Sequence, residues 1–385
     1  MSDPADRLRR HMVDELTASG NLPQEWRNAF LTVPRHSFIP DIVWRQDEQV
    51  ESYHDLVPLR RSDDEDAWLS LAYARDAVLT QIDDGHPTGV GMTGRQPTSS
   101  ASGPDIVAFM LAALNAQPGM TVCEIGTGTG YHAALLAARL GARNITTIEI
   151  DPQLAEQARH ALVDTGYGDV TVVTGDGADG YPPRAPYDRT IATCAVREVP
   201  YPWITQTRPG GQVLTPWGTA YLNSGLLSLT VGENGAAQGG IVGDVAFMWI
   251  RDQRVPPRTS VRECVYDQDN AVVNETDIHP YQVAGDRDAS FAIGLRVPSC
   301  KNIYAPAHDG SGEYTVWFLD QVSRSWASID YAPGADTYQV RQRGPRHLWD
   351  EVAAAYHCWT DAGSPKAEQW RFTVTSQGQH VEFVC

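Results

Sequence analysis

Glycines alternate with threonines over residues 126–130 (GTGTG), directly after an apolar stretch that begins at Thr121. Glycines at every second position let the backbone pass close to a ligand, and they leave free N–H groups at the start of a following helix. Glu124 precedes this loop, and Glu149 ends the next apolar stretch. A third acidic residue, Asp176, lies in a Gly-Asp-Gly sequence after the third such stretch. The pattern indicates a ligand site with a glycine cradle and several acidic contacts.

The spacing of the glycines distinguishes between two nucleotide-like ligands. Dinucleotide-binding folds use GxGxxG, whereas this loop is GxGxG. Glu149 is placed to bind both hydroxyls of a ribose, and the carboxylate of Asp176 is placed to bind an adenine amino group. The sequence therefore predicts a site for S-adenosyl-L-methionine, with S-adenosyl-L-homocysteine as product, rather than a nicotinamide site. The predicted donor contacts are Glu124, Gly126, Thr127, Gly128, Gly130, Tyr131, Glu149, Ile150, Asp176 and Gly177.

Alternating strands and helices must position these residues. Short apolar runs predict strands at residues 121–125, 145–150, 170–174, 187–192 and 212–216. Helical patterns between them cover residues 106–114, 131–140 and 152–165. Strands that alternate with helices imply a parallel sheet covered on both faces, and hence an α/β fold.

The pattern changes beyond about Gly240. Short β-like runs such as Tyr314–Asp320 dominate, and one amphipathic helix carries Leu348, Val352, Tyr356 and Trp359 on one face. This part indicates a separate α+β domain. We therefore expect three parts: an N-terminal helical, acceptor-side segment over residues 1–80, a donor-binding core over residues 81–238 and a C-terminal domain over residues 239–385.

Composition excludes several classes of protein. The formal net charge is -18, which disfavours binding to nucleic acid and to anionic membranes. No apolar stretch approaches the roughly 20 residues of a membrane span, and the charged N-terminus has no secretory apolar region. The six cysteines are scattered, without zinc-ligand spacing, so we expect reduced thiols, no metal site and a cytoplasmic protein. The cysteines expected to be reduced are Cys123, Cys194, Cys264, Cys300, Cys358 and Cys385.

Five motifs carry a resemblance to a known family. They are VPRHSFIP (33–40), EIGTGTGYHAALLA (124–137), TIEIDPQLAEQA (147–158), GDGADGYPPRAPYD (175–188) and RPGGQVLTPWG (208–218). Over roughly residues 1–230 the chain resembles the protein-L-isoaspartate (D-aspartate) O-methyltransferases. The resemblance implies a Rossmann-like class I methyltransferase with a parallel-rich seven-stranded sheet, S-adenosylmethionine as donor and a peptide carboxylate as acceptor.

The acceptor side departs from the pattern of that family. The family shows T-I-S-[QA]-P, whereas residues 97–104 are PTSSASGP, within a polar stretch (85–102) that predicts a long loop. The resemblance implies that Ser102 holds the acceptor carboxylate. It leaves open whether the neighbouring Ser99 and Ser100 also act, and whether the segment Thr193, Cys194 and Ala195 lines the peptide site or only packs.

The reaction itself requires no general base. A side-chain carboxylate is already ionised at neutral pH, so it can accept a methyl group directly. His36 and His132 lie beside the motifs, and we therefore expect both to be hydrogen-bonded structural residues rather than catalysts.

The additional C-terminal residues, with GPRHLWDEVAAAYHCW at 344–359, resemble a bacterial branch associated with ribosomally made, modified peptides such as lanthipeptides and graspetides. That resemblance implies methylation of ordinary L-aspartate in a crosslinked precursor peptide, with closure of the ester to aspartimide and peptide recognition by the C-terminal domain. Two alternatives stay open. One is repair of isoaspartate, and the other is a binding module on an inactive methyltransferase scaffold, which the intact donor contacts disfavour.

Overall fold

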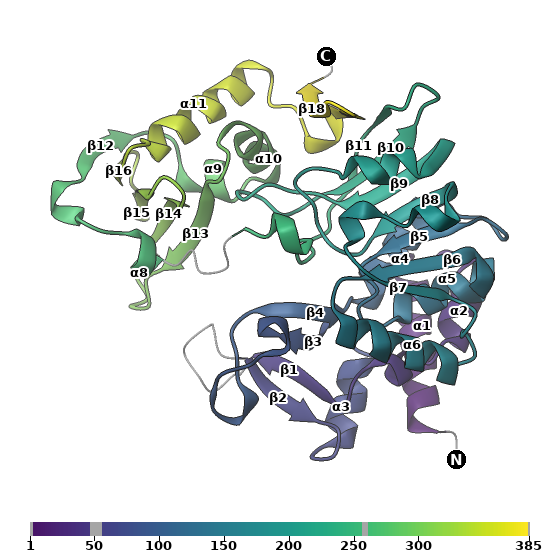
Figure 1. The fold of residues 1–385 in the computed structure, drawn as a ribbon. Coiled ribbons are helices and arrows are strands. Elements are labelled where there is room, and N and C mark those ends of the chain that lie inside the picture. The colour runs from purple at the N-terminus through teal and green to yellow at the C-terminus, as the bar shows by residue number, and fades with distance from the viewer. Residues whose placement is uncertain (1–2, 47–55, 256–260, 384–385) are drawn as a thin grey trace.

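The computed structural model describes residues 3–46, 56–255 and 261–383 (Figure 1). Its strands form three sheets: a four-stranded sheet near the N-terminus, a central nine-stranded sheet and a five-stranded sheet built from later residues. No helix in these ranges is both long and apolar enough to cross a lipid bilayer.

The N-terminal part combines helices with an antiparallel sheet of order β2-β1-β3-β4. Asp3 caps α1 by accepting a hydrogen bond from the Ala5 N–H, and the helix buries Met12 and Leu16. The elements are α1 (Pro4–Ala18), α2 (Arg27–Thr32), β1 (Ile42–Gln46), β2 (Leu56–Arg60), α3 (Glu65–Ala72), β3 (Val78–Ile82) and β4 (Pro97–Ala101). The segment 1–80 therefore contains strands as well as the expected helices.

The prediction of a loop throughout residues 85–102 is wrong for its last part. Pro97–Ala101 is strand β4, paired antiparallel with β3, and it buries Ser99 and Ala101 on one side. Strand β4 is rich in polar residues because it lies at the edge of its sheet and lines the cavity described below.

The central sheet has the order β18-β17-β11-β10-β9-β8-β5-β6-β7. Its five strands from β7 to β9 are parallel, and the other four are antiparallel. The first strands of this sheet are β5 (Val122–Ile125), β6 (Ile145–Glu149), β7 (Thr171–Thr174), β8 (Tyr187–Ala192) and β9 (Thr207–Pro216). The antiparallel strands are β10 (Leu226–Val231), β11 (Ala237–Gly243), β17 (Trp370–Thr375) and β18 (Gly378–Phe383). All five strands predicted between residues 121 and 216 are confirmed.

The count of seven strands is not confirmed. Seven strands, from β7 to β11 in the sheet order, precede residue 244, and the C-terminal β17 and β18 add two more at the edge. Local sequence patterns do not predict the number of strands in this sheet, because β17 pairs with β11 across more than 120 residues of sequence.

Helices cover both faces of this sheet. They are α4 (Pro104–Leu114), α5 (Tyr131–Leu140), α6 (Pro152–Asp164) and α7 (Tyr201–Thr205). Proline stands at the start of α4 and α6, where its missing N–H costs no hydrogen bond. On one face, α4 and α5 pack with α1 and α2 in a single apolar core, and on the other face α7 contributes Trp203 and Ile204.

The remaining sheet has the order β12-β16-β15-β14-β13 and is antiparallel throughout. Its strands are β12 (Val272–Thr276), β13 (Lys301–Pro306), β14 (Tyr314–Asp320), β15 (Ser325–Tyr331) and β16 (Tyr338–Arg343). The accompanying helices are α8 (Val261–Cys264), α9 (Pro280–Ala284), α10 (Arg287–Arg296) and α11 (Leu348–Asp361). The amphipathic helix predicted from Leu348 is confirmed as α11, which packs against this sheet (Figure 1).

The expected division at residues 238 and 239 falls inside β11, and the chain returns to the same sheet at Trp370. The residues from β12 to α11 are therefore inserted between two neighbouring strands of the central sheet (Figure 1). This arrangement places the start of β13 beside the methyltransferase part, where both contribute to one cavity.

Candidate active site

One cavity of about 1800 Å³ is lined by three separate parts of the chain. The first part is the glycine loop with the carboxyl ends of β5, β6 and β8, and the second is β4 with its flanking residues. The third part consists of residues 219, 220, 223, 246–251, 254, 255, 261–263 and 301–303. Drug-sized ligands occupy pockets of roughly 300–1,000 Å³, so this cavity has room for a donor molecule and part of an acceptor.

The glycine loop lines one end of the cavity through Gly126, Thr127, Gly128 and Thr129. Gly126 and Gly128 have φ angles of 91° and 52°, a backbone region that favours glycine. A Cβ atom on Gly126 would lie 2.8 Å from the Thr193 hydroxyl oxygen, so a larger residue would displace Thr193, which follows β8. The loop therefore keeps its backbone close to the cavity, as the GxGxG pattern predicts.

Glu149 ends β6 and lines the same part of the cavity. Its Oε2 accepts a hydrogen bond from the Gly128 N–H at 2.9 Å, and its Oε1 accepts one from the Asp151 N–H at 3.1 Å. Burial raises the pKa of this carboxyl group above its ordinary value. Each carboxylate oxygen has a second lone pair, so Glu149 can accept two further hydrogen bonds from a ligand.

Asp176 and Gly177 form the next contact point in the cavity wall. The Asp176 Oδ1 accepts a hydrogen bond from the Ala178 N–H at 2.8 Å, which fixes the orientation of the carboxylate. A Cβ atom on Gly177 would lie 2.4 Å from the Ile125 side chain, so only glycine permits this approach to β5. Ile150 and Tyr131, which belong to the predicted contact set, also line the cavity.

Glu124, Gly130 and Ala195 belong to the predicted set but do not line the cavity. The Glu124 carboxylate is fully buried, 2.5 Å from the Nδ1 atom of His132 and 2.5 Å from the Thr147 hydroxyl that donates to it. Gly130, with φ of 87°, begins α5 against Ala158. The side chain of Glu124 therefore links β5 to His132 of α5 and Thr147 of β6, and it does not face the cavity.

The two histidines both have hydrogen-bond partners. His132 is bonded to Glu124, and the Nδ1 atom of His36 lies 2.6 Å from the Tyr73 hydroxyl. Burial lowers the pKa of His36, which favours its neutral form. These contacts fit the structural role predicted for both residues.

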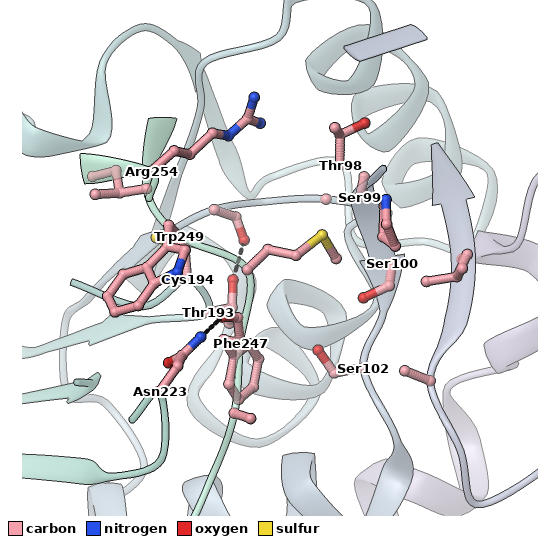
Figure 2. A pocket seen from close by; sticks show the side chains of 18 of the residues that line it. Thr98, Ser99, Ser100, Ser102, Thr193, Cys194, Asn223, Phe247, Trp249 and Arg254 are labelled. Atoms are coloured by element: carbon pink, nitrogen blue, oxygen red, sulfur yellow. Dashed lines mark hydrogen bonds between the residues drawn. The ribbon is translucent and has the colours of Figure 1, made fainter. Parts of the chain in front are cut away.

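The predicted acceptor serines line the cavity next to the glycine loop, since a Cβ atom on Gly128 would lie 3.6 Å from the Ser100 carbonyl oxygen and 3.8 Å from the Ser99 hydroxyl oxygen. Ser99 and Ser100 belong to β4, and Ser102 follows that strand. Ser99 is buried and accepts a hydrogen bond from the Thr80 hydroxyl at 3.2 Å, whereas Ser100 and Ser102 are partly exposed. Figure 2 shows the side chains of Ser100 and Ser102 directed into the cavity, toward the side of Phe247, whereas the Thr98 hydroxyl donates a hydrogen bond to Gln81 at 2.9 Å. Ser99, Ser100 and Ser102 form a wall of hydroxyl groups.

Arg35 fixes this serine strand, and sequence reasoning did not single it out. The guanidinium is completely buried and donates hydrogen bonds to the carbonyl oxygens of Ala101 at 3.2 Å, Ser102 at 3.0 Å and Ala72. Burial lowers its pKa to about 10, so it is still protonated at neutral pH. Arg35 lies in the VPRHSFIP motif, and this motif is the feature of the sequence that could have identified Arg35 as important for the site.

The residues after β8 connect the donor end of the cavity to its third wall. Thr193 and Cys194 line the cavity, and the Thr193 hydroxyl donates to the Gly126 carbonyl at 2.5 Å. Ala195 is buried, and its backbone pairs with Met248 and Ile250 at 2.8 and 2.9 Å. This pairing brings Phe247 and Trp249 to the cavity opposite the serines (Figure 2), together with Asn223 and Arg254, none of which sequence reasoning identified.

Comparison with known proteins identifies the family. The sequence profile of the protein-L-isoaspartate(D-aspartate) O-methyltransferases (PCMT) matches residues 84–254. A protein-L-isoaspartate O-methyltransferase of Hyperthermus butylicus is 38% identical over 224 residues, which cover 56% of this chain and 76% of that protein. The chain belongs to the protein-L-isoaspartate O-methyltransferase family. It is an S-adenosylmethionine-dependent O-methyltransferase.

Other members of the family give the same result. The enzyme of this name from Pyrococcus horikoshii is 37% identical over 240 residues, covering 62% of this chain and 90% of that one. A solved protein-L-isoaspartate O-methyltransferase structure aligns with a TM-score of 0.56 at 20% identity, over 98% of this chain and all of its own. The class I methyltransferase fold is therefore confirmed, and the structural likeness extends into the C-terminal residues.

The donor end of the cavity fits S-adenosylmethionine. A glycine cradle that a Cβ atom would obstruct and the acidic groups of Glu149 and Asp176 line one continuous space. When bound, the donor supplies a methyl group on a positively charged sulfur. Gly126 to Thr129, Glu149, Ile150, Asp176 and Gly177 are the residues that would hold it.

Proposed function

We propose that this protein methylates the side-chain carboxylate of an aspartate within a ribosomally made, macrocyclic modified peptide, and that the ester then closes to aspartimide. The observation that carries the proposal is the third wall of the cavity. Residues 246–251, 254, 255, 261–263 and 301–303 extend the space beyond the donor contacts, and those after 254 lie outside the range matched by the family profile. A cavity of this width suits a bulky crosslinked peptide better than a single extended chain.

The hydroxyl wall supports a carboxylate acceptor. An ionised carboxylate needs no base, so the protein must only orient it and remove its water. We assign Ser102 to donate a hydrogen bond to one carboxylate oxygen, with Ser99 and Ser100 beside it, while the other oxygen takes the methyl group. Thr193 and Cys194 line the same cavity and are proposed to contact the peptide.

The C-terminal residues are assigned to peptide recognition. In this proposal residues 81–238 bind the donor, residues 1–80 support the acceptor strand, and residues 239–385 select the peptide. Arg262 and Lys301 lie in the cavity wall although they belong to the C-terminal part, which supports this assignment.

Closure of the ester requires no further residue. The backbone nitrogen of the residue after the aspartate attacks the ester carbonyl and forms the new C–N bond. The C–O bond to the methoxy group breaks, and the proton lost from nitrogen leaves with that group as methanol. Atoms and charge balance without an oxidant or a second substrate.

A second function is favoured by the relatives. The proteins from Hyperthermus butylicus and Pyrococcus horikoshii carry the name protein-L-isoaspartate O-methyltransferase. Repair of isoaspartyl residues is therefore the alternative. The C-terminal residues do not by themselves separate the two functions, because the solved structure of that name aligns over 98% of this chain.

The two functions are separated by a competition between two peptides. One is a linear isoaspartyl peptide, and the other contains ordinary aspartate inside a ring closed by an amide between lysine and glutamate side chains. We expect kcat/KM to favour the ring peptide by a factor on the order of 100. Mass spectrometry would record addition of one methyl group followed by loss of methanol. Faster methylation of the linear peptide would establish the repair function instead.

Replacing Ser102 by alanine is expected to lower kcat/KM roughly 10- to 100-fold, because one hydrogen bond to a charged oxygen is lost. Binding of S-adenosylhomocysteine, measured by calorimetry, is expected to be unchanged, since Ser102 is not among the assigned donor contacts. Ser62 is exposed on the segment before α3 and does not line the cavity, so Ser62→Ala is the control. Equal activity of the Ser102 variant and the control would remove Ser102 from the acceptor site.

A further inference from the structure

Two cations of the C-terminal part stand out in the cavity wall. Lys301, the first residue of β13, and Arg262, in α8, both line the cavity. The chain carries a net charge of -18 and contains only two lysines, Lys301 and Lys366. Because the chain is strongly acidic overall, two cations that face a cavity are candidates for contact with an anionic ligand.

The other cavity cations with recorded ion pairs are neutralised by the protein itself. Arg75 lies 2.5 Å from Asp105, and Arg254 lies 2.8 Å from Asp84. Arg251 pairs with the same Asp84 at 3.5 Å and with Asp151 at 4.0 Å, so three carboxylates balance these three arginines. These pairs leave little positive charge for a ligand on that part of the wall.

Lys301 is different. It is partly buried, and burial lowers the pKa of its ammonium group. Within residues 3–46, 56–255 and 261–383 the ammonium has neither a hydrogen bond nor an ion pair, and Arg262 has no ion pair there either. Glu263 also lines the cavity, so these three residues together contribute one net positive charge. A desolvated cation without an anion is unfavourable, and a bound anion would relieve that cost.

The chemistry of the reaction decides which anion this is. A carboxylate that reacts loses its negative charge in the transition state, so an ion pair with lysine would stabilise its ground state and slow the reaction. The neutral hydroxyl wall suits the reacting carboxylate, and the cations suit a carboxylate that stays charged.

We infer that Lys301, with Arg262, forms a subsite for a second, non-reacting carboxylate of the acceptor, which makes the substrate an acidic peptide. The inference rests on the proposed carboxyl methylation and deepens it by naming the class of peptide. Contact with a second carboxylate would hold the peptide by the C-terminal wall while the target aspartate lies at the serines.

The test uses the full-length protein and two lactam-ring peptides that differ at one position. Each contains one aspartate in the ring, followed two residues later by glutamate in one peptide and glutamine in the other. For the wild-type protein we expect KM for the glutamate peptide to be about tenfold lower, with similar kcat. Lys301→Gln should abolish this difference, and Lys301→Arg should retain most of it. Lys366→Gln is the matched control, since Lys366 is exposed and does not line the cavity.

Each outcome bears on a separate claim. No preference for glutamate in the wild type, or an equal rise in KM for both peptides in Lys301→Gln, would overturn the subsite. Methylation of neither peptide would contradict the proposed acceptor, and the subsite is then tested by binding alone. For that purpose acetyl-tetraglutamate amide is titrated into the protein loaded with S-adenosylhomocysteine. About tenfold weaker binding by Lys301→Gln supports the subsite, and equal binding or none refutes it.

Discussion

Replacing Glu149 by alanine is expected to weaken binding of S-adenosylhomocysteine by a factor on the order of 100 or more. The side chain offers two free lone pairs in the cavity, and hydrogen bonds to a charged acceptor contribute roughly 1.5–3 kcal/mol each. The substitution also removes the acceptors of the Gly128 and Asp151 N–H groups, so the glycine loop loses its anchor. Isothermal titration calorimetry measures the dissociation constant directly.

Two further variants make the result specific. Glu149→Gln keeps one oxygen acceptor without the charge and should fall between the wild type and Glu149→Ala. Glu156 is largely exposed on α6, where it pairs only with Arg159 and His160 in the described part of the chain, so Glu156→Ala should bind normally. Wild-type affinity in Glu149→Ala, with an unchanged thermal midpoint, would exclude Glu149 from the donor site.

Replacing Arg35 by leucine is expected to lower the free energy of unfolding by about 3–5 kcal/mol. Leucine fills part of the space but leaves three carbonyl oxygens without their donor, at Ala72, Ala101 and Ser102. Buried acceptors that lose a partner are costly because no water replaces it. Urea denaturation measures the change, with Arg10→Leu, at an exposed position of α1, as the control.

Arg35→Lys separates stability from positioning. Lysine keeps the charge, but a single ammonium group lacks the planar fork that reaches three carbonyls. We expect a smaller loss of stability, a lower kcat for peptide methylation and unchanged affinity for S-adenosylhomocysteine. A parallel loss of donor affinity would show that Arg35 supports the whole cavity and not the serine strand in particular.

The donor side of the site was predictable because its signals are local. Gly126, Gly128 and Glu149 lie in short strand-to-helix units, so a few consecutive residues determine both their backbone and their place in the cavity. The parallel strands around them follow from the same units. The burial of Glu124 was not predictable, because it depends on His132 and Thr147, which come from two other elements.

The acceptor side depends on contacts between distant residues. Ser99 and Ser100 belong to a strand only because β3 pairs with it, and Arg35 reaches Ser102 across 67 positions of sequence. Phe247 and Trp249 reach the cavity because their segment pairs with Ala195. Local patterns in a single sequence do not predict pairings between such distant residues. For β4, the polar composition indicated a loop instead of a strand.

The return of the chain to the central sheet at β17 determines how the protein can be shortened. A chain that ends after Gly243 would lack β17, so β11 would lose its strand partner. It would also lack Phe372, which is fully buried with its ring centroid 4.9 Å from that of Trp217. The exposed strand edge would then invite aggregation. A minimal catalytic unit should instead be made by deleting the inserted residues from β12 to α11 and joining the two ends of the remaining chain. The last two strands, β17 and β18, then stay in the central sheet.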